Sequence, residues 1–392
     1  MNRRKSLHIY ILLWIIYSFN GVLYEPSGFL ARGSFLFIML MSFNDIYNVI
    51  KEGITNPYIK GLNLLVLMFT VYGGIFILDR EVLYNGRMEV VPHITYIKTI
   101  YMALLPFYSF YRYAREGYLS EKVIVKLLPL FMLVALVKYL DNMFSRQEML
   151  GGEGITNNMG YYFVALMPFA YLLNKRKSLQ YSYLFFNYIF ALLSVKRGAI
   201  ILATILLLWF LFNGMKVKKN KGKIFVISIV AIVGMTLAFK YMVGHNDYFA
   251  SRLEGTIEGT SGNERGDMYT EMLEWYLDNN SIEGLLLGNG PYTSIKLIGQ
   301  PAHNDWLEIA LAQGLLGIVV YLLYWYFLVR TVLLYKKTNN KVSFCISSSF
   351  FIIYFLKTLF SMSYASIPFY AMLILGFAMA QQPYAHCVRK RE

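Results

Sequence analysis

The chain carries repeated apolar runs whose lengths match the thickness of a lipid bilayer. A helix of roughly 17 to 25 apolar residues crosses the hydrocarbon core, which is roughly 30 Å thick. In hydrocarbon, only helices or closed barrels satisfy all of their backbone polar groups. We therefore predict an all-α fold, a polytopic helical membrane protein with about 12 transmembrane helices. The runs lie near residues 7–23, 29–50, 61–78, 94–111, 123–140, 157–173, 179–195, 198–213, 224–243, 303–334, 343–360 and 364–380.

Composition supports this prediction and narrows the expected partners. Charged residues make up only 15% of the chain, whereas a soluble domain has roughly 25%. The formal net charge of +14 comes from basic residues in short segments between apolar runs, a pattern that orients membrane helices. We therefore expect no nucleic-acid partner. The two cysteines, Cys345 and Cys387, do not suggest a disulfide framework.

The distribution of Lys and Arg predicts the orientation of the chain. The most basic blocks, NKRKS at 174–178 and MKVKKNKGK at 215–223, mark cytoplasmic loops by the positive-inside rule. An even number of spans then places both termini in the cytoplasm. The first run follows a basic start and lacks a small-residue cleavage site, so we expect a retained signal anchor.

This orientation divides the chain into four segments. Residues 1–243 form an N-terminal transmembrane bundle of about nine spans, and 244–302 form an extracytoplasmic loop. Residues 303–380 form the C-terminal transmembrane helices, and 381–392 form a basic cytoplasmic tail. Pro168 lies inside a span, so neighbouring helices must satisfy the backbone that it frees, and Pro368 interrupts the last run.

The outer loop has an internal pattern. Residues 266–280, GDMYTEMLEWYLDNN, place apolar side chains at helical spacing with acids between them, which predicts an amphipathic helix on the membrane surface or over a cavity. The apolar positions are Tyr269, Met272, Leu273 and Tyr276. The segment GLLLGNGP follows, in which Gly288 and Gly290 precede a proline and predict a turn-rich return to the membrane.

Two arginines on the predicted outer side are candidate phosphate ligands. Arg197 follows Lys196 in a tight outer hairpin, where cations run against the orientation bias. A guanidinium suits phosphate oxygens and stays charged, although an interfacial Arg can also simply anchor a hairpin. Arg265 precedes the amphipathic helix in an acidic loop, where the alternative is a weak surface ion pair.

His303 and Asn304 open the helix that follows the loop, in PAHNDWLEIALAQGLLG at 301–317. Histidine titrates near neutral pH and can take a proton from an attacking hydroxyl. The alternative is that His303 is an interfacial histidine that caps the helix. Glu308 follows Asn304 by four residues, so the two share a face of the helix.

Other classes of site lack support in the sequence. It has no GxxxxGK loop, and GNGPYTS is too short for a dinucleotide phosphate cradle. No Cys or His cluster has metal-ligand spacing, so we expect neither a metal nor another cofactor. Lys138, Lys240 and Lys357 lie within or at the ends of spans, where they are functional candidates or snorkelling residues.

Taken together, the motifs resemble the O-antigen ligase and polymerase superfamily of Wzy-type membrane glycosyltransferases. Three segments carry the resemblance over residues 190 to 335: SVKRGA, ERGDMYTEMLEWYLDNNSIEGLLLGNGP, and AHNDWLEIALAQGLLG. The family usually has Ser immediately before the hairpin arginine, where this chain has Lys196. The resemblance implies that Arg197 and Arg265 bind the diphosphate of an undecaprenyl-linked glycan and that His303 helps activate the acceptor hydroxyl. Lys196, Asn304, Glu308, Gly288 and Gly290 are the associated substrate-binding candidates.

The implied function is a metal-independent polysaccharide polymerase for O-antigen or capsule repeat units, on the outer side of the bacterial cytoplasmic membrane. Its expected partners are an undecaprenyl-diphosphate-linked oligosaccharide, an acceptor glycan, membrane lipid, and flippase and chain-length regulator proteins. A ligase that passes finished polymer to a lipid core shares these motifs and stays open. A lipid-linked oligosaccharide flippase is the alternative from another class, although we find no two-half repeat.

Overall fold

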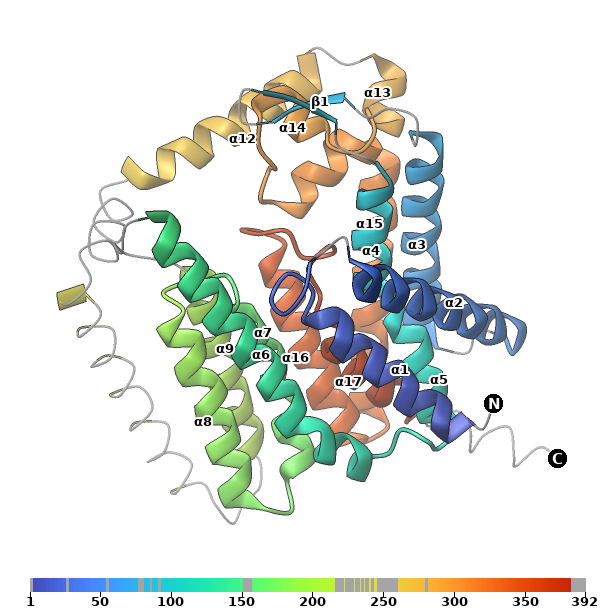
Figure 1. Cartoon of the computed structure of the whole chain (residues 1–392), viewed down its shortest axis with the longest axis vertical. Coiled ribbons are helices and arrows are strands. Elements are labelled where there is room, and N and C mark those ends of the chain that lie inside the picture. Colours follow the sequence, from blue (N-terminus) through green and yellow to red (C-terminus); the bar gives the residue numbers. More distant parts are fainter. Residues whose placement is uncertain are drawn as a thin grey trace. The chain divides into compact units, whose positions relative to one another are not determined.

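The computed structural model describes residues 3–25, 28–53, 56–76, 81–84, 87–90, 93–150, 157–215, 260–278 and 281–381, and a few isolated positions between 216 and 259. The predicted span at 224–243, the loop at 245–259 and the tail from 382 lie outside the described residues, those isolated positions excepted. Figure 1 shows the chain. The helices are α1 (Arg3–Ser18), α2 (Phe29–Lys51), α3 (Pro57–Ile75), α4 (His93–Leu104), α5 (Pro106–Arg115), α6 (Glu121–Leu150), α7 (Gly160–Leu166), the 3-10 helix η1 (Met167–Leu173), α8 (Lys177–Leu193), α9 (Arg197–Met215), α12 (Thr260–Asp278), α13 (Ile282–Leu287), α14 (Thr293–Ile298), α15 (Asp305–Lys337), α16 (Lys341–Lys357) and α17 (Phe369–Ala380).

The predominantly helical, membrane-type fold agrees with the sequence prediction. Four helices among the described residues are long and apolar enough to cross a membrane: Phe29–Lys51, Pro57–Ile75, Glu121–Ser145 and Asp305–Lys337. Three shorter apolar stretches accompany them, Gly160–Leu173, Arg197–Asn213 and Phe369–Ala380. The larger number of about 12 spans stays a prediction.

One element departs from the all-α prediction. Strands β1 (Glu81–Tyr84) and β2 (Arg87–Val90) pair antiparallel, with Glu81 opposite Val90 and Tyr84 opposite Arg87. The sequence carried a signal for this hairpin, because Asn85-Gly86 stands between the two runs, and such a dipeptide favours a two-residue hairpin loop. The hairpin follows α3 and precedes α4.

Prolines define several helix boundaries. Pro57 is the first residue of α3, and Asn56 before it accepts a hydrogen bond from the backbone N–H of Tyr58, a typical N-cap. Pro368 is the N-cap of α17, so the last helix begins later than the apolar run at residue 364. These positions suit proline because the first turn needs no N–H from it.

Pro168 removes the usual donor to the carbonyl of Val164, which instead accepts from the N–H of Met167 in the same segment, and helix α8 donates to other carbonyls nearby. The α-helix gives way at Met167 to the 3-10 helix η1. Gln180 Nε2 of α8 donates to the carbonyl of Ala170 at 2.7 Å, and the Tyr183 hydroxyl donates to the carbonyl of Leu166 at 3.1 Å. A neighbouring helix therefore supplies donors to the interrupted backbone, as is needed where no water is present.

The contacts divide the chain into two compact units. Unit 1 comprises residues 1–129 and 268–392, and unit 2 comprises residues 130–267. The units are defined by packing, whereas the four segments inferred from the sequence are defined by membrane placement and stay a prediction.

Hydrogen bonds align the helices of unit 1. Asn56 Nδ2, before α3, donates to the carbonyl of Met379 at 3.5 Å, and the Tyr335 hydroxyl donates to the same carbonyl at 3.1 Å. Asn340 Nδ2, before α16, donates to the carbonyl of Gln381 at 2.8 Å. These bonds therefore bring four helix ends together at one end of unit 1: the start of α3, the end of α15, the start of α16 and the end of α17. We call this end of unit 1 the terminal end.

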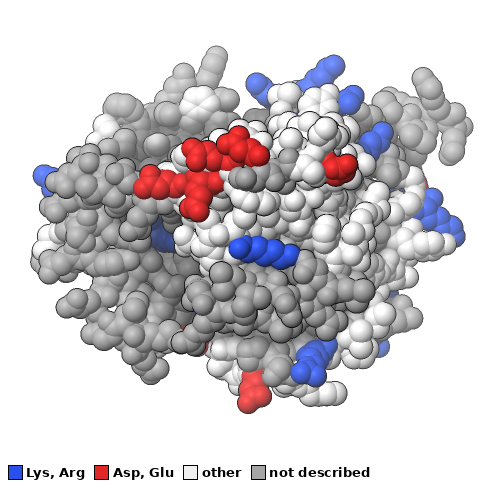
Figure 2. All heavy atoms as spheres, turned by 90° about the horizontal axis from the view of Figure 1, so that it is seen from above, with Lys and Arg blue, Asp and Glu red and all other residues white. Residues whose placement is uncertain are grey.

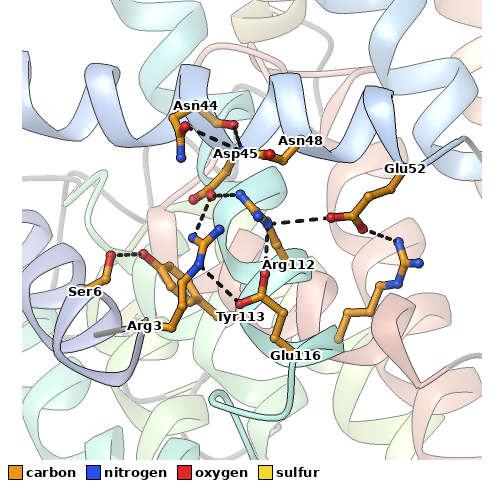
Figure 3. A network of polar contacts seen from close by, with 10 residues as sticks. Arg3, Ser6, Asn44, Asp45, Asn48, Glu52, Arg112, Tyr113 and Glu116 are labelled. Atoms are coloured by element: carbon orange, nitrogen blue, oxygen red, sulfur yellow. Dashed lines mark hydrogen bonds and ion pairs between the residues drawn. The ribbon is translucent and has the colours of Figure 1, made fainter. Parts of the chain in front are cut away.

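Ion pairs join α1, α2 and α5 in unit 1 (Figure 3). Arg112 is nearly buried and lies 2.9 Å from both Asp45 Oδ1 and Glu116 Oε1. Arg3 NH1 lies 3.4 Å from Asp45 Oδ1, and Arg115 NH1 lies 2.9 Å from Glu52 Oε2. Asp45 is only 2% exposed, and these arginines supply opposite charges to its buried carboxyl group.

Unit 2 contains the antiparallel helices α7, α8 and α9 (green in Figure 1). Residues 194–196 connect α8 to α9. Gly160 at the start of α7 lies against this connection, because a Cβ on Gly160 would lie 2.3 Å from Ser194 Oγ. The backbone N–H of Asn157 also donates to the carbonyl of Ser194 at 2.7 Å. The connection is thus fixed against the start of α7.

Candidate active site

Helix α15 is a folded-back pair of helices and not the continuous span predicted at 303–334. Gly314 has φ 64° and ψ −160°, which interrupts the helix. Asp305 and Tyr321 would lie about 24 Å apart along a straight helix of 1.5 Å rise. Instead, the Tyr321 hydroxyl donates to Asp305 Oδ2 at 2.6 Å. The segment 305–313 therefore lies antiparallel to the first turns of the segment 315–337.

Small residues permit this close approach. A Cβ on Gly317 would lie 2.8 Å from Cγ2 of Ile309, and the rings of Trp306 and Tyr321 lie 5.0 Å apart. The longer segment, residues 315–337, has a length of about 34 Å and can cross a bilayer alone. The predicted base, His303, consequently lies beside the second turn of this segment and not beyond its end.

Backbone N–H groups of the GLLLGNGP segment donate hydrogen bonds to carbonyl groups at the tip of the helical hairpin. The N–H of Asn289 donates to the carbonyl of Leu311, and the N–H of Gly290 donates to the carbonyl of Ala312, each at 2.9 Å. An interrupted helix leaves such carbonyls without their usual partners. These two bonds therefore stabilise the fold-back.

Gly288 and Gly290, the predicted substrate-binding glycines, both pack closely against other segments of unit 1. Gly288 has φ +78°, and a Cβ there would lie 2.4 Å from the backbone nitrogen of Gln313. Gly290 has φ +88°, and a Cβ there would lie 2.7 Å from the ring of Phe76. Glycine is required at both positions because any other residue would combine a left-handed backbone with a steric clash.

His303 and Asn304 form the turn before α15. Asn304 is its N-cap: Oδ1 accepts hydrogen bonds from the N–H groups of Trp306 at 2.9 Å and Leu307 at 3.2 Å. His303 has φ 52°, a left-handed conformation that a non-glycine residue adopts at a cost. Its side chain is half-buried. The cap therefore orients the turn, and His303 keeps part of its surface exposed.

Glu308 supports this turn from inside the protein. It is 6% exposed, and its carboxylate accepts hydrogen bonds from Ser294 Oγ at 2.8 Å and from the N–H of Ala302 at 3.0 Å. The sequence suggested a substrate-binding role for Glu308. The structure places it under the residue before His303, where it holds the turn to α14.

Tyr292 lies close to this carboxylate. Burial, with a smaller contribution from the charge of Glu308, raises the pKa of Tyr292 to about 12. The phenol therefore stays protonated at neutral pH. It can donate a hydrogen bond but is not a base under those conditions.

Asp305, which directly follows Asn304, was not among the residues selected from the sequence. It is fully buried, and in addition to the bond from Tyr321 it accepts the N–H groups of Ser363 at 2.8 Å and Tyr364 at 3.3 Å. The available signal was an acid in the first turn of a helix, where the helix dipole favours a negative charge. Nothing local indicated its distant partners.

Lys196 and Arg197 lie at the connection between α8 and α9 in unit 2. Val195 has φ 53°, which is unusual for a β-branched residue, and the N–H of Lys196 donates to Ser194 Oγ at 3.3 Å. Arg197 begins α9, and both basic side chains are half-buried. The structure thus confirms the tight helical hairpin and places two cations at its turn.

Arg265 lies within α12, and its side chain is outside the described part of the chain. The predicted amphipathic helix is present and begins earlier, at Thr260. Met268 and Met272 are buried against Ala302 and Leu311, with Tyr269 and Tyr276 alongside. Leu273, predicted on the same face, is 49% exposed. The helix therefore packs over the start of α15.

The outer side of α12 is acidic. Asp267, Glu271, Glu274 and Asp278 follow one another at helical spacing, and all four are exposed. Figure 2 shows Asp and Glu gathered there. Such a stripe is normally solvated and favours water over an apolar environment.

Within unit 1, the structure brings together five of the predicted residues around the α15 hairpin: Gly288, Gly290, His303, Asn304 and Glu308. Lys196, Arg197 and Arg265 belong to unit 2. The described residues contain no group of three or more His, Cys, Asp or Glu that could hold a metal ion. No protein-family model matches the chain, and no curated protein sequence matches it significantly.

Proposed function

We propose that the chain is a membrane glycosyltransferase of the O-antigen ligase and polymerase type, acting as a polysaccharide repeat-unit polymerase. The observation that carries the proposal is the His303 turn. A half-buried imidazole stands on a left-handed residue, with Asn304 capping the helix behind it and Glu308 fixing the backbone before it. A general base needs this kind of fixed position near an accessible surface.

Backbone conformation gives independent support. The described residues include four non-glycine residues with positive φ: Val195, Tyr292, His303 and Asn339. Three of them lie within two residues of predicted site residues, beside Arg197, beside Gly290, and at His303 itself. Strained backbone of this kind clusters at functional sites.

We further propose about 12 spans, an outward-facing site and cytoplasmic termini in a bacterial cytoplasmic membrane. Charge at the terminal end of unit 1 supports this orientation. Lys336 and Lys337 end α15 there, and Lys341 begins α16. The acidic stripe of α12 lies within the loop that we predict to be extracytoplasmic, residues 244–302. Cytoplasmic ends carry the excess of Lys and Arg, so the opposite end, which holds His303, faces outward.

In the proposed reaction, the acceptor hydroxyl oxygen bonds to the anomeric carbon of the donor sugar, and the bond from that carbon to the diphosphate oxygen breaks. His303 takes the hydroxyl proton. The electron pair of the broken bond leaves with undecaprenyl diphosphate. Arg197 and Arg265, aided by Lys196, stabilise that negative charge, a role in which fixed cations in a poorly hydrated site are effective. No metal enters this mechanism.

Two alternatives remain open. A ligase would use the same residues to pass finished polymer to a lipid core or other acceptor. A flippase would instead use the interrupted helix α15 and the buried Lys357, whose Nζ donates to Ser366 Oγ at 2.5 Å, because transporters use discontinuous helices and intramembrane charges.

The test compares glycan chain length by gel in a deletion strain carrying wild-type protein, His303→Ala or Arg265→Ala at equal expression. Single repeat units on the carrier or core support the polymerase. Full-length polymer left on the carrier lipid indicates the ligase. Lipid-linked units that accumulate on the cytoplasmic side indicate the flippase, and unchanged polymer in both variants contradicts the proposed site.

A further inference from the structure

The turn that carries His303 is bound to a second loop, the connection from α16 to α17. The backbone N–H of Asp305 donates to the carbonyl of Thr358 at 3.0 Å. Trp306 Nε1 donates to Thr358 Oγ1 at 2.9 Å. The carboxylate of Asp305 completes the link through the backbone N–H groups of residues 363 and 364. The two loops therefore form one group.

Asp305 stands at the centre of this group. Its side chain is 0% exposed, and it accepts hydrogen bonds from both loop N–H groups and from the Tyr321 hydroxyl. One carboxylate thereby joins three parts of unit 1: the start of α15, the segment beyond its fold-back, and the 358–364 connection. An ionised carboxylate can accept all three bonds, whereas an amide cannot.

We propose that Asp305, held by Tyr321, is the positioning residue that fixes His303 for proton transfer. This inference rests on the proposed function. Asp305 follows His303 by two residues, so its anchor determines where the left-handed turn lies and which way the imidazole points. Displacement of a catalytic group by about 1 Å can lower a rate by about 100-fold. The 358–364 connection then holds residues 304–306, directly after His303, in place.

The experiment uses purified full-length protein in liposomes, with undecaprenyl-diphosphate-linked repeat unit extracted from the deletion strain as both donor and acceptor. Asp305→Asn keeps the shape of the side chain, but its NH2 group faces one of the loop N–H groups. We expect kcat to fall by about 10- to 100-fold per folded molecule while KM changes by less than about threefold. We expect Tyr321→Phe to lower kcat as well, because it removes one of the three hydrogen bonds to Asp305.

The double variant tests whether the two residues act together. Because they share one hydrogen bond, we expect Asp305→Asn with Tyr321→Phe to resemble Asp305→Asn alone, and not to show the product of the two effects. Asp45→Asn is the matched control, since it removes a buried charge at another place in unit 1. It should lower the amount of folded protein but leave kcat per folded molecule unchanged.

The outcomes separate this inference from the proposed function. If His303→Ala abolishes transfer while Asp305→Asn keeps the wild-type kcat, the positioning role is wrong and the function stands. An Asp305→Asn variant that loses only folded protein, as the Asp45→Asn control does, also contradicts the positioning role. If His303→Ala transfers at the wild-type rate, the proposed function itself fails, and the inference fails with it.

Discussion

Replacing Glu308 separates a structural role from a substrate-binding role. In Glu308→Ala, the N–H of Ala302 and the hydroxyl of Ser294 lose their acceptor, and both residues are 0% exposed in the wild-type fold. A hydrogen bond to a charged group contributes about 1.5 to 3 kcal/mol. Two such bonds give an expected loss of about 3 to 6 kcal/mol in the free energy of unfolding.

Glu308→Gln should behave differently. The amide oxygen can accept from the Ala302 N–H, and the NH2 group can donate to Ser294 Oγ, because a hydroxyl both donates and accepts. Only the charge assistance is lost, so we expect a decrease of about 1 kcal/mol. Transfer activity per folded molecule should stay near the wild-type value.

The assay is equilibrium unfolding in mixed detergent micelles, followed by tryptophan fluorescence. Glu274→Ala, an exposed acid of α12, is the control and should leave the curve unchanged. A Glu308→Ala protein as stable as wild type would refute the structural role. A Glu308→Gln protein with full stability but greatly reduced activity would instead mean that the charge of Glu308 contacts substrate.

Two further predictions follow from packing and charge. Gly288→Ala places a Cβ 2.4 Å from a backbone nitrogen at a φ of +78°. We expect this change to lower the free energy of unfolding by at least about 3 kcal/mol, measured by the same unfolding assay. An unfolding curve identical to that of wild type would contradict the described contact between Gly288 and the tip of the α15 hairpin. Arg112→Ala leaves the buried Asp45 with Arg3 alone, which should cost about 3 to 5 kcal/mol. Arg115→Ala, whose side chain is 42% exposed, should cost less than about 1 kcal/mol, and equal losses in the two variants would contradict the account of this network.

Local sequence rules predicted local structure. A helix begins directly after His303 and Asn304, α12 is amphipathic, and α8 supplies donors to the backbone near Pro168. Each of these features depends on residues a few positions apart or on a general property of the membrane interior. Asn85-Gly86 also predicted a hairpin by a local rule, but the hydropathy reading passed over it.

The fold-back of α15 could not be predicted in this way. The sequence ALAQGLLG continues an apolar helical pattern, in which an isolated glycine is ordinarily tolerated. What closes the hairpin is distant in sequence: Gly288 and its neighbours at the tip, and Tyr321 with the 358–364 connection around Asp305. The same distance explains why Asp305 was overlooked.

The most direct test of the account is the rate of glycan transfer in liposomes that contain purified wild-type protein or His303→Ala, with undecaprenyl-diphosphate-linked repeat unit as the only substrate. General base catalysis contributes about 100- to 10,000-fold. We predict a loss in that range for His303→Ala, with the protein folded and the lipid-linked donor still bound. Transfer at the wild-type rate by the folded His303→Ala protein would contradict it.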